Sequence, residues 1–187
     1  MGKVYDAIDD RLAAFIRRQH VFFVGTAPLA ADGHVNVSPK GLEALAILGP
    51  HEVAYLDLTG SGIETVSHLR ENGRIVIMFC AFEGAPKILR LYGRGEVIEA
   101  DDPRSADLRA LFGDHIGVRS VIRVELDRIS DSCGYGVPRM AYDEDRDTGA
   151  RWAENKGEDG LQAYREEENA ESIDGLPGLP SVSPVTR

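Results

Sequence analysis

Residues 53–65 read Val53-Ala-Tyr-Leu-Asp-Leu-Thr-Gly-Ser-Gly-Ile-Glu-Thr65, and the rest of the chain is organised around this stretch. It begins as an apolar run typical of a strand and breaks at the small residues 59–62. A helical pattern follows at once, because Ile63, Val66 and Leu69 recur every three residues. A small, hydroxyl-rich loop that enters a helix points backbone N–H groups at one spot, which suits an anion. The alternatives are an ordinary turn, or a helix that Ser61 caps.

The composition of the chain is that of a soluble globular protein. Its 187 residues are 43% hydrophobic and 28% charged, which is typical of one domain with its own core. No apolar run approaches the roughly 18 residues that a membrane span needs, and the N-terminus lacks an apolar signal core. We therefore expect a cytoplasmic protein with no membrane partner. Cys80 and Cys133 lie far apart in the sequence, which predicts neither a disulfide framework nor a zinc site.

The net charge of −10 is concentrated in one late segment. Residues 143–174 hold 12 acidic and 4 basic side chains, whereas the preceding chain is nearly balanced. Because there is no basic stripe, we expect no nucleic-acid partner. We interpret the acidic segment as a solvated helix, with a surface for a basic partner as the alternative.

The hydrophobic pattern predicts a mainly β fold with peripheral helices. Strands are predicted at residues 20–27, 34–38, 53–58, 74–82, 87–99 and 120–129, with a short strand or turn at 45–50. Helices are predicted at residues 6–19, 62–71 and 103–112, and a helix-like acidic stretch at 152–170. The antiparallel-looking order favours a closed or partly closed β-barrel over a doubly wound sheet. Gly93-Arg-Gly-Glu96 lies inside a strand, and we interpret it as a bulge or bend.

The second predicted strand carries polar side chains at every other position. The period of two places Asn36, Ser38 and Lys40 on one face, and we expect Val35 and Val37 to point into a core. We expect Pro39-Lys40-Gly41 to break this strand. An amide, a hydroxyl and an ammonium group on one face suit the polar edge of a heterocycle together with an anion. The alternative is the solvated outer face of an edge strand.

Other reactive side chains show no catalytic pattern. The five histidines have no metal-ligand spacing, and no nucleophile–base pair is evident. Cys80 lies in an apolar strand and is expected to be an inert core residue, whereas Cys133 is expected to be more exposed.

Three segments together carry a resemblance to a known family. They are His34-Val-Asn-Val-Ser-Pro-Lys-Gly41, then Thr59-Gly-Ser-Gly-Ile-Glu-Thr65 with His68-Leu-Arg-Glu-Asn-Gly-Arg-Ile-Val-Ile-Met-Phe79, and Pro86-Lys-Ile-Leu-Arg-Leu-Tyr-Gly-Arg-Gly-Glu-Val97. These segments resemble the pyridoxamine 5′-phosphate oxidase-like family of FMN-binding split β-barrels over roughly residues 6–130. The resemblance implies a homodimer with FMN in the clefts between the two subunits. It also implies a barrel at residues 1–131 and a C-terminal extension at 132–187 that packs on or near it, similar to an extension in one branch of the family. From their own composition, with Pro180 and Pro184, we expect the last residues to form an extended arm.

The resemblance also implies which residues bind the cofactor. Asn36, Ser38 and Lys40 would contact the flavin ring edge, ribityl chain or phosphate. The flavin would be lined, largely by backbone atoms, by Asp57, Leu58 and Thr59, and its phosphate would be held by Ser61 and Gly62. Three further residues would reach the cofactor from the other subunit: Phe82, Ile88 and Arg90.

The chain departs from the true oxidases of this family at two places. They carry a Ser-Arg-Lys phosphate cluster where this chain has Ser61-Gly62-Ile63, and an Arg-Leu-x-Pro substrate motif where it has Tyr135-Gly-Val-Pro-Arg-Met140. We therefore expect an FMN-dependent oxidoreductase that transfers hydride to or from flavin N5 on a small substrate or reduced nicotinamide, without an identified catalytic side chain. The alternatives are a non-catalytic flavin, haem or deazaflavin module and, less favoured, a true pyridoxamine 5′-phosphate oxidase.

Overall fold

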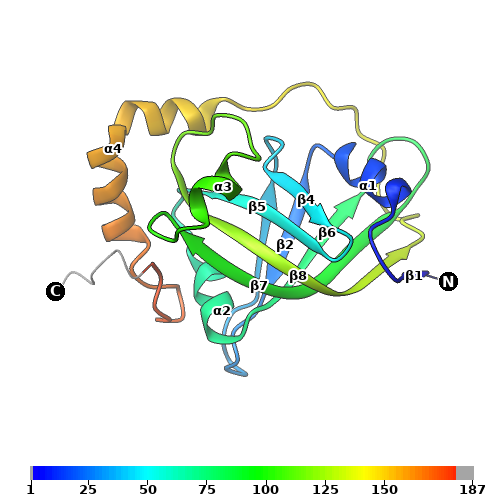
Figure 1. The fold of residues 1–187 in the computed structure, drawn as a ribbon, viewed down its shortest axis with the longest axis horizontal. Helices are drawn as coiled ribbons and strands as arrows, with labels where there is room; N and C mark the ends of the chain where they lie inside the picture. Colours follow the sequence, from blue (N-terminus) through cyan, green and yellow to red (C-terminus); the bar gives the residue numbers. More distant parts are fainter. Residues whose placement is uncertain (1, 180–187) are drawn as a thin grey trace.

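The computed structural model describes residues 2–179, and these form a curled antiparallel sheet with helices at its periphery (Figure 1). The eight strands are β1 (Val4–Tyr5), β2 (Phe22–Thr26), β3 (Asn36–Lys40), β4 (Leu45–Gly49), β5 (Glu52–Leu58), β6 (Arg74–Cys80), β7 (Ile88–Glu99) and β8 (Val118–Ser132). The helices are α1 (Asp10–Arg17), α2 (Glu64–Asn72), α3 (Ser105–Arg109) and α4 (Thr148–Glu168). None of the helices in this part of the chain is long and apolar enough to cross a membrane.

The strands follow the order β3-β2-β6-β7-β8-β5-β4, and β1 pairs with β8. All of the pairs are antiparallel, so the sheet is a split barrel whose path ends at β3 and β4. The predicted mainly β architecture is confirmed. The register between β7 and β8 shifts at Tyr92/Gly93, which confirms the bulge predicted for this glycine-rich segment.

The barrel interior and two helices form the main hydrophobic core. Helix α2 contributes Ile63, Val66 and Leu69, the three residues whose spacing predicted it. The helix ends at Gly73, which has a left-handed φ of 69°, a conformation that favours glycine. Ile63 occupies the N-cap position without a side-chain cap, so Ser61 does not cap this helix.

The outer strand β3 corrects two predictions from the sequence. Val35 and Val37 are 72% and 65% exposed, so they do not enter a core. The polar residues that alternate with them, Asn36, Ser38 and Lys40, face inward instead. Pro39 does not break the strand, because within the described residues β3 pairs with β2 alone and its other edge needs no donor. The alternation therefore identified the two faces correctly, but the prediction that Val35 and Val37 enter a core is wrong.

Helices α1 and α3 are shorter than the sequence predicted, because local hydrogen bonds end or replace them. Helix α1 begins at Asp10 rather than at residue 6, because the Asp9 carboxylate accepts a hydrogen bond from Leu12 N at 2.8 Å and caps it. Helix α3 covers only five residues of the predicted 103–112, because bonds from Leu111 N and Phe112 N to residues three positions back close turns instead. Strand β1 was not predicted from the sequence.

The C-terminal extension crosses the upper edge of the barrel and then descends beside it (Figure 1). Met140 N donates to Phe82 O at 3.0 Å near its start, and α4 follows, with a bend at Gly157. Its last described residues return to the barrel, where Leu179 is buried in the main core. His34 N and Nδ1 bond the Asp174 carboxylate at 2.7 and 2.6 Å, which ties the extension to the β2–β3 hairpin. The predicted extended arm with Pro180 and Pro184 lies outside the described residues.

Candidate functional site

A buried carboxylate at the end of β5 lies between two basic side chains. Asp57 Oδ2 accepts from Arg119 Nε at 2.6 Å and from Ser120 Oγ at 3.3 Å. Its other oxygen, Oδ1, is 3.3 Å from Lys40 Nζ and from Arg119 Nη2. Because Lys40 ends β3 and Asp57 lies on β5, this contact brings the outer strand β3 to a strand near the other end of the sheet.

The charges around Asp57 determine the protonation state of its carboxyl group. Burial by itself raises the pKa of Asp57, but Arg119 and Lys40 lower it further than burial raises it, so the net pKa lies below the usual range. Asp57 is therefore ionised at neutral pH. One negative and two positive charges leave a surplus of one positive charge, which resides on the partly exposed Lys40.

Arg119 also holds the loop that was predicted to bind an anion. Its Nη1 donates to Gly60 O at 3.1 Å, and its Nη2 donates to Gly62 O at 2.8 Å. With the bonds to Asp57 and one from Nη1 to Asn169 Oδ1 at 2.9 Å, all five N–H groups of the guanidinium have partners. Arg119 is therefore a clamp behind the loop and has no donor left for a ligand.

The extension reaches the same loop through Asn169 and Arg165. Asn169 Nδ2 donates to Gly60 O at 2.9 Å, and Arg165 Nε donates to Thr59 Oγ1 at 3.0 Å. Thr59 in turn bonds Gly117 O at 2.8 Å through both its backbone N and its hydroxyl. The loop is consequently held from the barrel on one side and from the extension on the other.

The inward face of β3 forms a chain of hydrogen bonds to α2. Ser38 Oγ donates to Asn36 Oδ1 at 3.3 Å, and Asn36 Nδ2 donates to Thr65 Oγ1 at 3.0 Å. Asn36 Nδ2 is also 3.4 Å from Thr26 Oγ1, which shares a 3.0 Å hydrogen bond with His68 Nδ1. Both Asn36 N–H groups are thus directed inward, and Ser38 and Lys40 are the more available polar groups of this strand.

His68 is fully buried, and its Nε2 has no partner among the described residues. Burial lowers its pKa, so it is neutral at neutral pH. Together with the Thr26 contact, this makes His68 a core residue beneath the polar face.

The predicted site residues fall into two groups. Hydrogen bonds join Asn36 to Ser38 and Lys40 to Asp57, and Arg119 links Asp57 to Gly62. Ser61 is contacted by Asn169, and Thr59 by Arg165. Ser61 and Gly62 are exposed, whereas the Leu58 side chain packs in a second apolar cluster with Leu108 and Phe112. A cavity of about 660 Å³ between this region and the extension is lined in part by Leu58 and Thr59.

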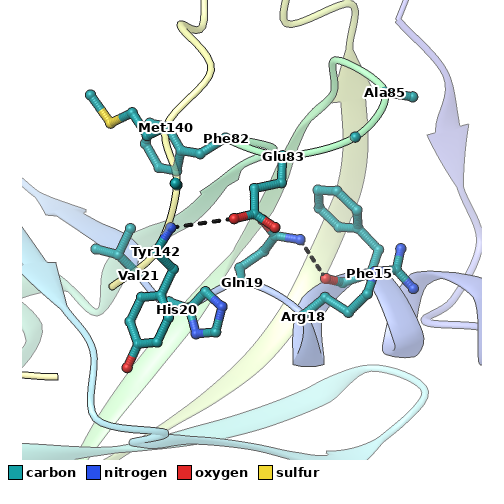
Figure 2. Close-up of a pocket in the computed structure, with 12 residues that line it drawn as sticks. Phe15, Arg18, Gln19, His20, Val21, Phe82, Glu83, Ala85, Met140 and Tyr142 are labelled. Carbon is teal, nitrogen blue, oxygen red and sulfur yellow. Dashed lines mark hydrogen bonds between the residues drawn. The ribbon is translucent and has the colours of Figure 1, made fainter. Parts of the chain in front are cut away.

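Phe82, Ile88 and Arg90 lie elsewhere in this chain. Strand β7 is three strands from β3 in the sheet, and Arg90 Nη1 bonds Ser132 Oγ at 3.0 Å. Phe82 lines a separate cavity of about 670 Å³ under residues 140–142 of the extension (Figure 2). In Figure 2 the Tyr142 ring lies on His20, with ring centroids 3.7 Å apart. Within one chain these three residues do not join the Lys40–Asp57 cluster.

Sequence reasoning missed Arg119, Asn169, Thr26 and Thr65. Arg119 directly precedes the predicted strand 120–129, and no local pattern distinguishes it from a surface arginine. The loop itself holds no cation, which leaves Lys40, backbone N–H groups or a cation elsewhere in the chain to meet a phosphate, and this was the available signal. Asn169 lies 109 residues from Gly60, and its role depends entirely on how the extension packs.

The family described as "Pyridoxamine 5'-phosphate oxidase" matches residues 8–133 of this chain. The chain is 42% identical over 197 aligned residues to the pyridoxamine 5′-phosphate oxidase family protein ustO of Aspergillus flavus. That match covers 95% of this chain and 78% of the relative, so it includes most of the C-terminal extension.

Solved structures share the fold at low sequence identity. A Lactobacillus delbrueckii protein named for the same oxidase is 18% identical, with a TM-score of 0.53, and the match covers 68% of this chain and 98% of that one. The HupZ protein of Group A Streptococcus is 21% identical, with a TM-score of 0.52, over 67% of this chain and 99% of that one. These two likenesses concern the barrel fold. On the family match and the ustO relative, the chain belongs to the pyridoxamine 5′-phosphate oxidase family.

Proposed function

We propose that this chain binds FMN in a homodimer and acts as an FMN-dependent oxidoreductase on a small substrate or reduced nicotinamide. The observation that carries the proposal is the Lys40–Asp57–Arg119 cluster beside loop 59–62, with its surplus positive charge. Membership of the pyridoxamine 5′-phosphate oxidase family supports the same cofactor class.

The donors of the cluster fit a cofactor with an anionic end and a polar ring edge. The Lys40 ammonium has three N–H groups, one of which bonds Asp57, and its side chain is 21% exposed. Two donors therefore remain for anionic oxygens. Ser38 offers a partly exposed hydroxyl two residues away on the same face, which suits the ribityl chain or the ring edge.

The outer face of β3 supports the homodimer. Val35 and Val37 expose large apolar side chains on a strand whose second edge has no partner within the described residues. Contiguous exposed apolar side chains on an edge strand are typical of a surface that another chain covers. In such a homodimer, Phe82, Ile88 and Arg90 of the other subunit are the residues proposed to reach the cofactor.

In the proposed site this chain binds and orients, and the cofactor would supply hydride transfer at flavin N5 when bound. Lys40 would hold the anionic end, and Asp57 keeps Lys40 and Arg119 in place. Since Asp57 is ionised and buried between two cations, it is not proposed as a proton donor. The chemistry would thus depend on positioning rather than on a side-chain acid or base.

The absorption spectrum of the purified protein tests this proposal. We expect flavin maxima, release of FMN on denaturation, and bleaching when reduced nicotinamide or another hydride donor is added without oxygen. Flavin that stays bound and unreduced by a panel of donors would favour the non-catalytic module instead. A colourless protein that takes up no added FMN would refute the cofactor assignment, and a haem spectrum would replace it.

A further inference from the structure

We propose that Asn169, in the C-terminal extension, is a positioning residue for loop 59–62: with Arg119 it orients the loop's backbone N–H groups toward the phosphate of the cofactor. This inference depends on the proposed function only for the identity of the ligand. The orientation itself follows from the contacts of the loop.

Three consecutive carbonyl groups of the loop point to the same two side chains. Gly60 O accepts from Asn169 Nδ2 at 2.9 Å and from Arg119 Nη1 at 3.1 Å. Ser61 O is 3.4 Å from Asn169 Nδ2, and Gly62 O accepts from Arg119 Nη2 at 2.8 Å. The carbonyls of residues 60, 61 and 62 are therefore turned toward the seam between barrel and extension.

Peptide geometry then fixes where the loop donors point. The described chain has no cis peptide bond, and in a trans peptide the N–H is antiparallel to the C=O of the preceding residue. The N–H groups of Ser61, Gly62 and Ile63 consequently point away from the seam. No described residue accepts from these three groups, and Ser61 and Gly62 are exposed. Successive N–H groups that face one side are the arrangement that binds anionic oxygens.

Asn169 is itself held in place by the packing of the extension. It is fully buried, and its backbone N bonds Arg165 O at 2.8 Å at the end of α4. Gly178 lies so close that a methyl group there would overlap Asn169 O. Leu179, one residue later, is inserted into the barrel core. Because Asn169 is buried and fixed by these contacts, its side chain is suited to hold loop 59–62 in one orientation.

The arrangement offers a physical reason for the lost cations of this chain. Ser61-Gly62-Ile63 replaces a Ser-Arg-Lys cluster, so the phosphate cannot be met by side chains within the loop. Here the cation lies behind the loop as Arg119, and its charge is offset by Asp57. The extension would replace direct ion pairing with aligned backbone donors, together with Lys40.

A comparison of FMN with riboflavin, which lacks the phosphate, tests the role of Asn169. We expect Asn169→Ala and Asn169→Asp to weaken FMN binding about tenfold, the loss of one hydrogen bond to the loop, and to leave riboflavin binding within about twofold. Asn169→Asp keeps the side-chain shape and the acceptor for Arg119 but cannot donate to Gly60 O. Glu167→Ala, an exposed change on the same turn, is the control and should alter neither affinity.

Equal losses for FMN and riboflavin in the folded variants would overturn the proposal, because they would indicate general damage to the site. Unchanged FMN affinity in both variants would overturn it as well. Failure of the wild-type protein to bind either flavin would instead refute the proposed function. Thermal unfolding of each variant distinguishes these results from a loss of folding.

Hydrogen exchange of the wild-type protein tests the orientation without any substitution. We expect the amides of Ser61, Gly62 and Ile63 to exchange fast in the free protein, and FMN but not riboflavin to protect them. Slow exchange of these amides in the free protein would contradict outward-facing donors, whatever the ligand is. In the FMN-bound protein, faster exchange of these amides in Asn169→Asp than in wild type would support the role of Asn169 in setting the loop, and equal exchange would contradict it.

Discussion

Arg119 and Asp57 form a buried ion pair beside the candidate site, with Arg119 Nε 2.6 Å from Asp57 Oδ2. The pair links β8 to the neighbouring β5, and the same guanidinium reaches the loop after β5 and the extension beyond α4. Both side chains are at least 96% inaccessible to solvent. Breaking such a pair leaves an uncompensated buried charge, which costs free energy. The pair therefore favours the one packing of β5, β8, the loop and the extension in which both charges are satisfied.

Removing the cation of this pair should destabilise the fold strongly. Arg119→Met removes the closest cation from the buried, ionised Asp57 and leaves two acceptors, Gly62 O and Asn169 Oδ1, without their donor, which predicts a loss of about 3–5 kcal/mol in the free energy of unfolding. Arg123→Met is the matched control, because its ion pairs with Glu52 and Glu96 are about a third exposed and contribute about 1 kcal/mol or less. Urea denaturation of both variants makes the comparison, and equal losses would contradict the role given to Arg119.

The depressed pKa of Asp57 predicts a loss of stability in acid. The ionised carboxylate contributes stability that is fully present above its unfolded pKa of about 3.9 and is lost as the pH falls through the lower folded pKa. The difference in unfolding free energy between wild type and Asp57→Asn should therefore be largest near pH 6 and shrink below about pH 4. Denaturation series at several pH values measure it. A constant difference down to pH 2.5 would contradict a folded pKa of Asp57 below its unfolded value.

The elements of this fold were predictable where the signal is local. Apolar runs located six of the eight strands and the core face of α2, because burial of neighbouring residues leaves a period in the sequence. The face of β3 was not predictable in the same way. A period of two separates Val35 and Val37 from Ser38, but it does not say which side meets α2.

The candidate site was predictable only in part for a related reason. The loop at residues 59–62 and the polar side chains of β3 carry their chemistry in short segments. Arg119 and Asn169 acquire theirs from partners 50 to 109 residues away, which no window of sequence contains. The absence of a cation in the loop was visible in the sequence, but the position of Arg119 behind the loop follows from the pairing of β8 with β5.

Gly93 should tolerate no side chain at the β7–β8 bulge. A methyl group there would overlap the carbonyl oxygen of Glu125 and crowd Leu126, both backbone atoms that cannot move without shifting the register. We expect Gly93→Ala to lower the free energy of unfolding by about 2–3 kcal/mol. Gly113→Ala, where no atom lies within 4 Å of the added methyl, should change it by less than about 0.5 kcal/mol. Thermal denaturation of the two variants checks the difference.

Lys40 should contribute directly to the proposed FMN site. Lys40→Ala removes the partly exposed surplus charge and its two remaining donors, so FMN affinity should fall about 10- to 100-fold. Stability should change little, because the bond to Asp57 is long at 3.3 Å and Arg119 continues to pair with Asp57. Lys156→Ala, on exposed α4, is the control for the loss of one positive charge. Fluorescence titration with FMN measures both, and equal affinities for the two variants would exclude Lys40 from the site.

Glu64 should oppose the same ligand from the first turn of α2. Its Oε2 lies beside the Gly62 backbone, close to where the phosphate is proposed, and a nearby carboxylate repels an anion. Glu64→Gln should therefore raise FMN affinity about two- to fivefold, more at low salt than at high salt. The same change should lower stability by about 0.3–1 kcal/mol, because an acid at a helix N-terminus is favourable.

Glu71→Gln, near the other end of α2 and about 10 Å away, should leave FMN affinity unchanged. Opposite signs for affinity and stability in Glu64→Gln would be difficult to obtain from general damage to the fold. If affinity instead falls in step with stability, the phosphate does not lie at this end of α2.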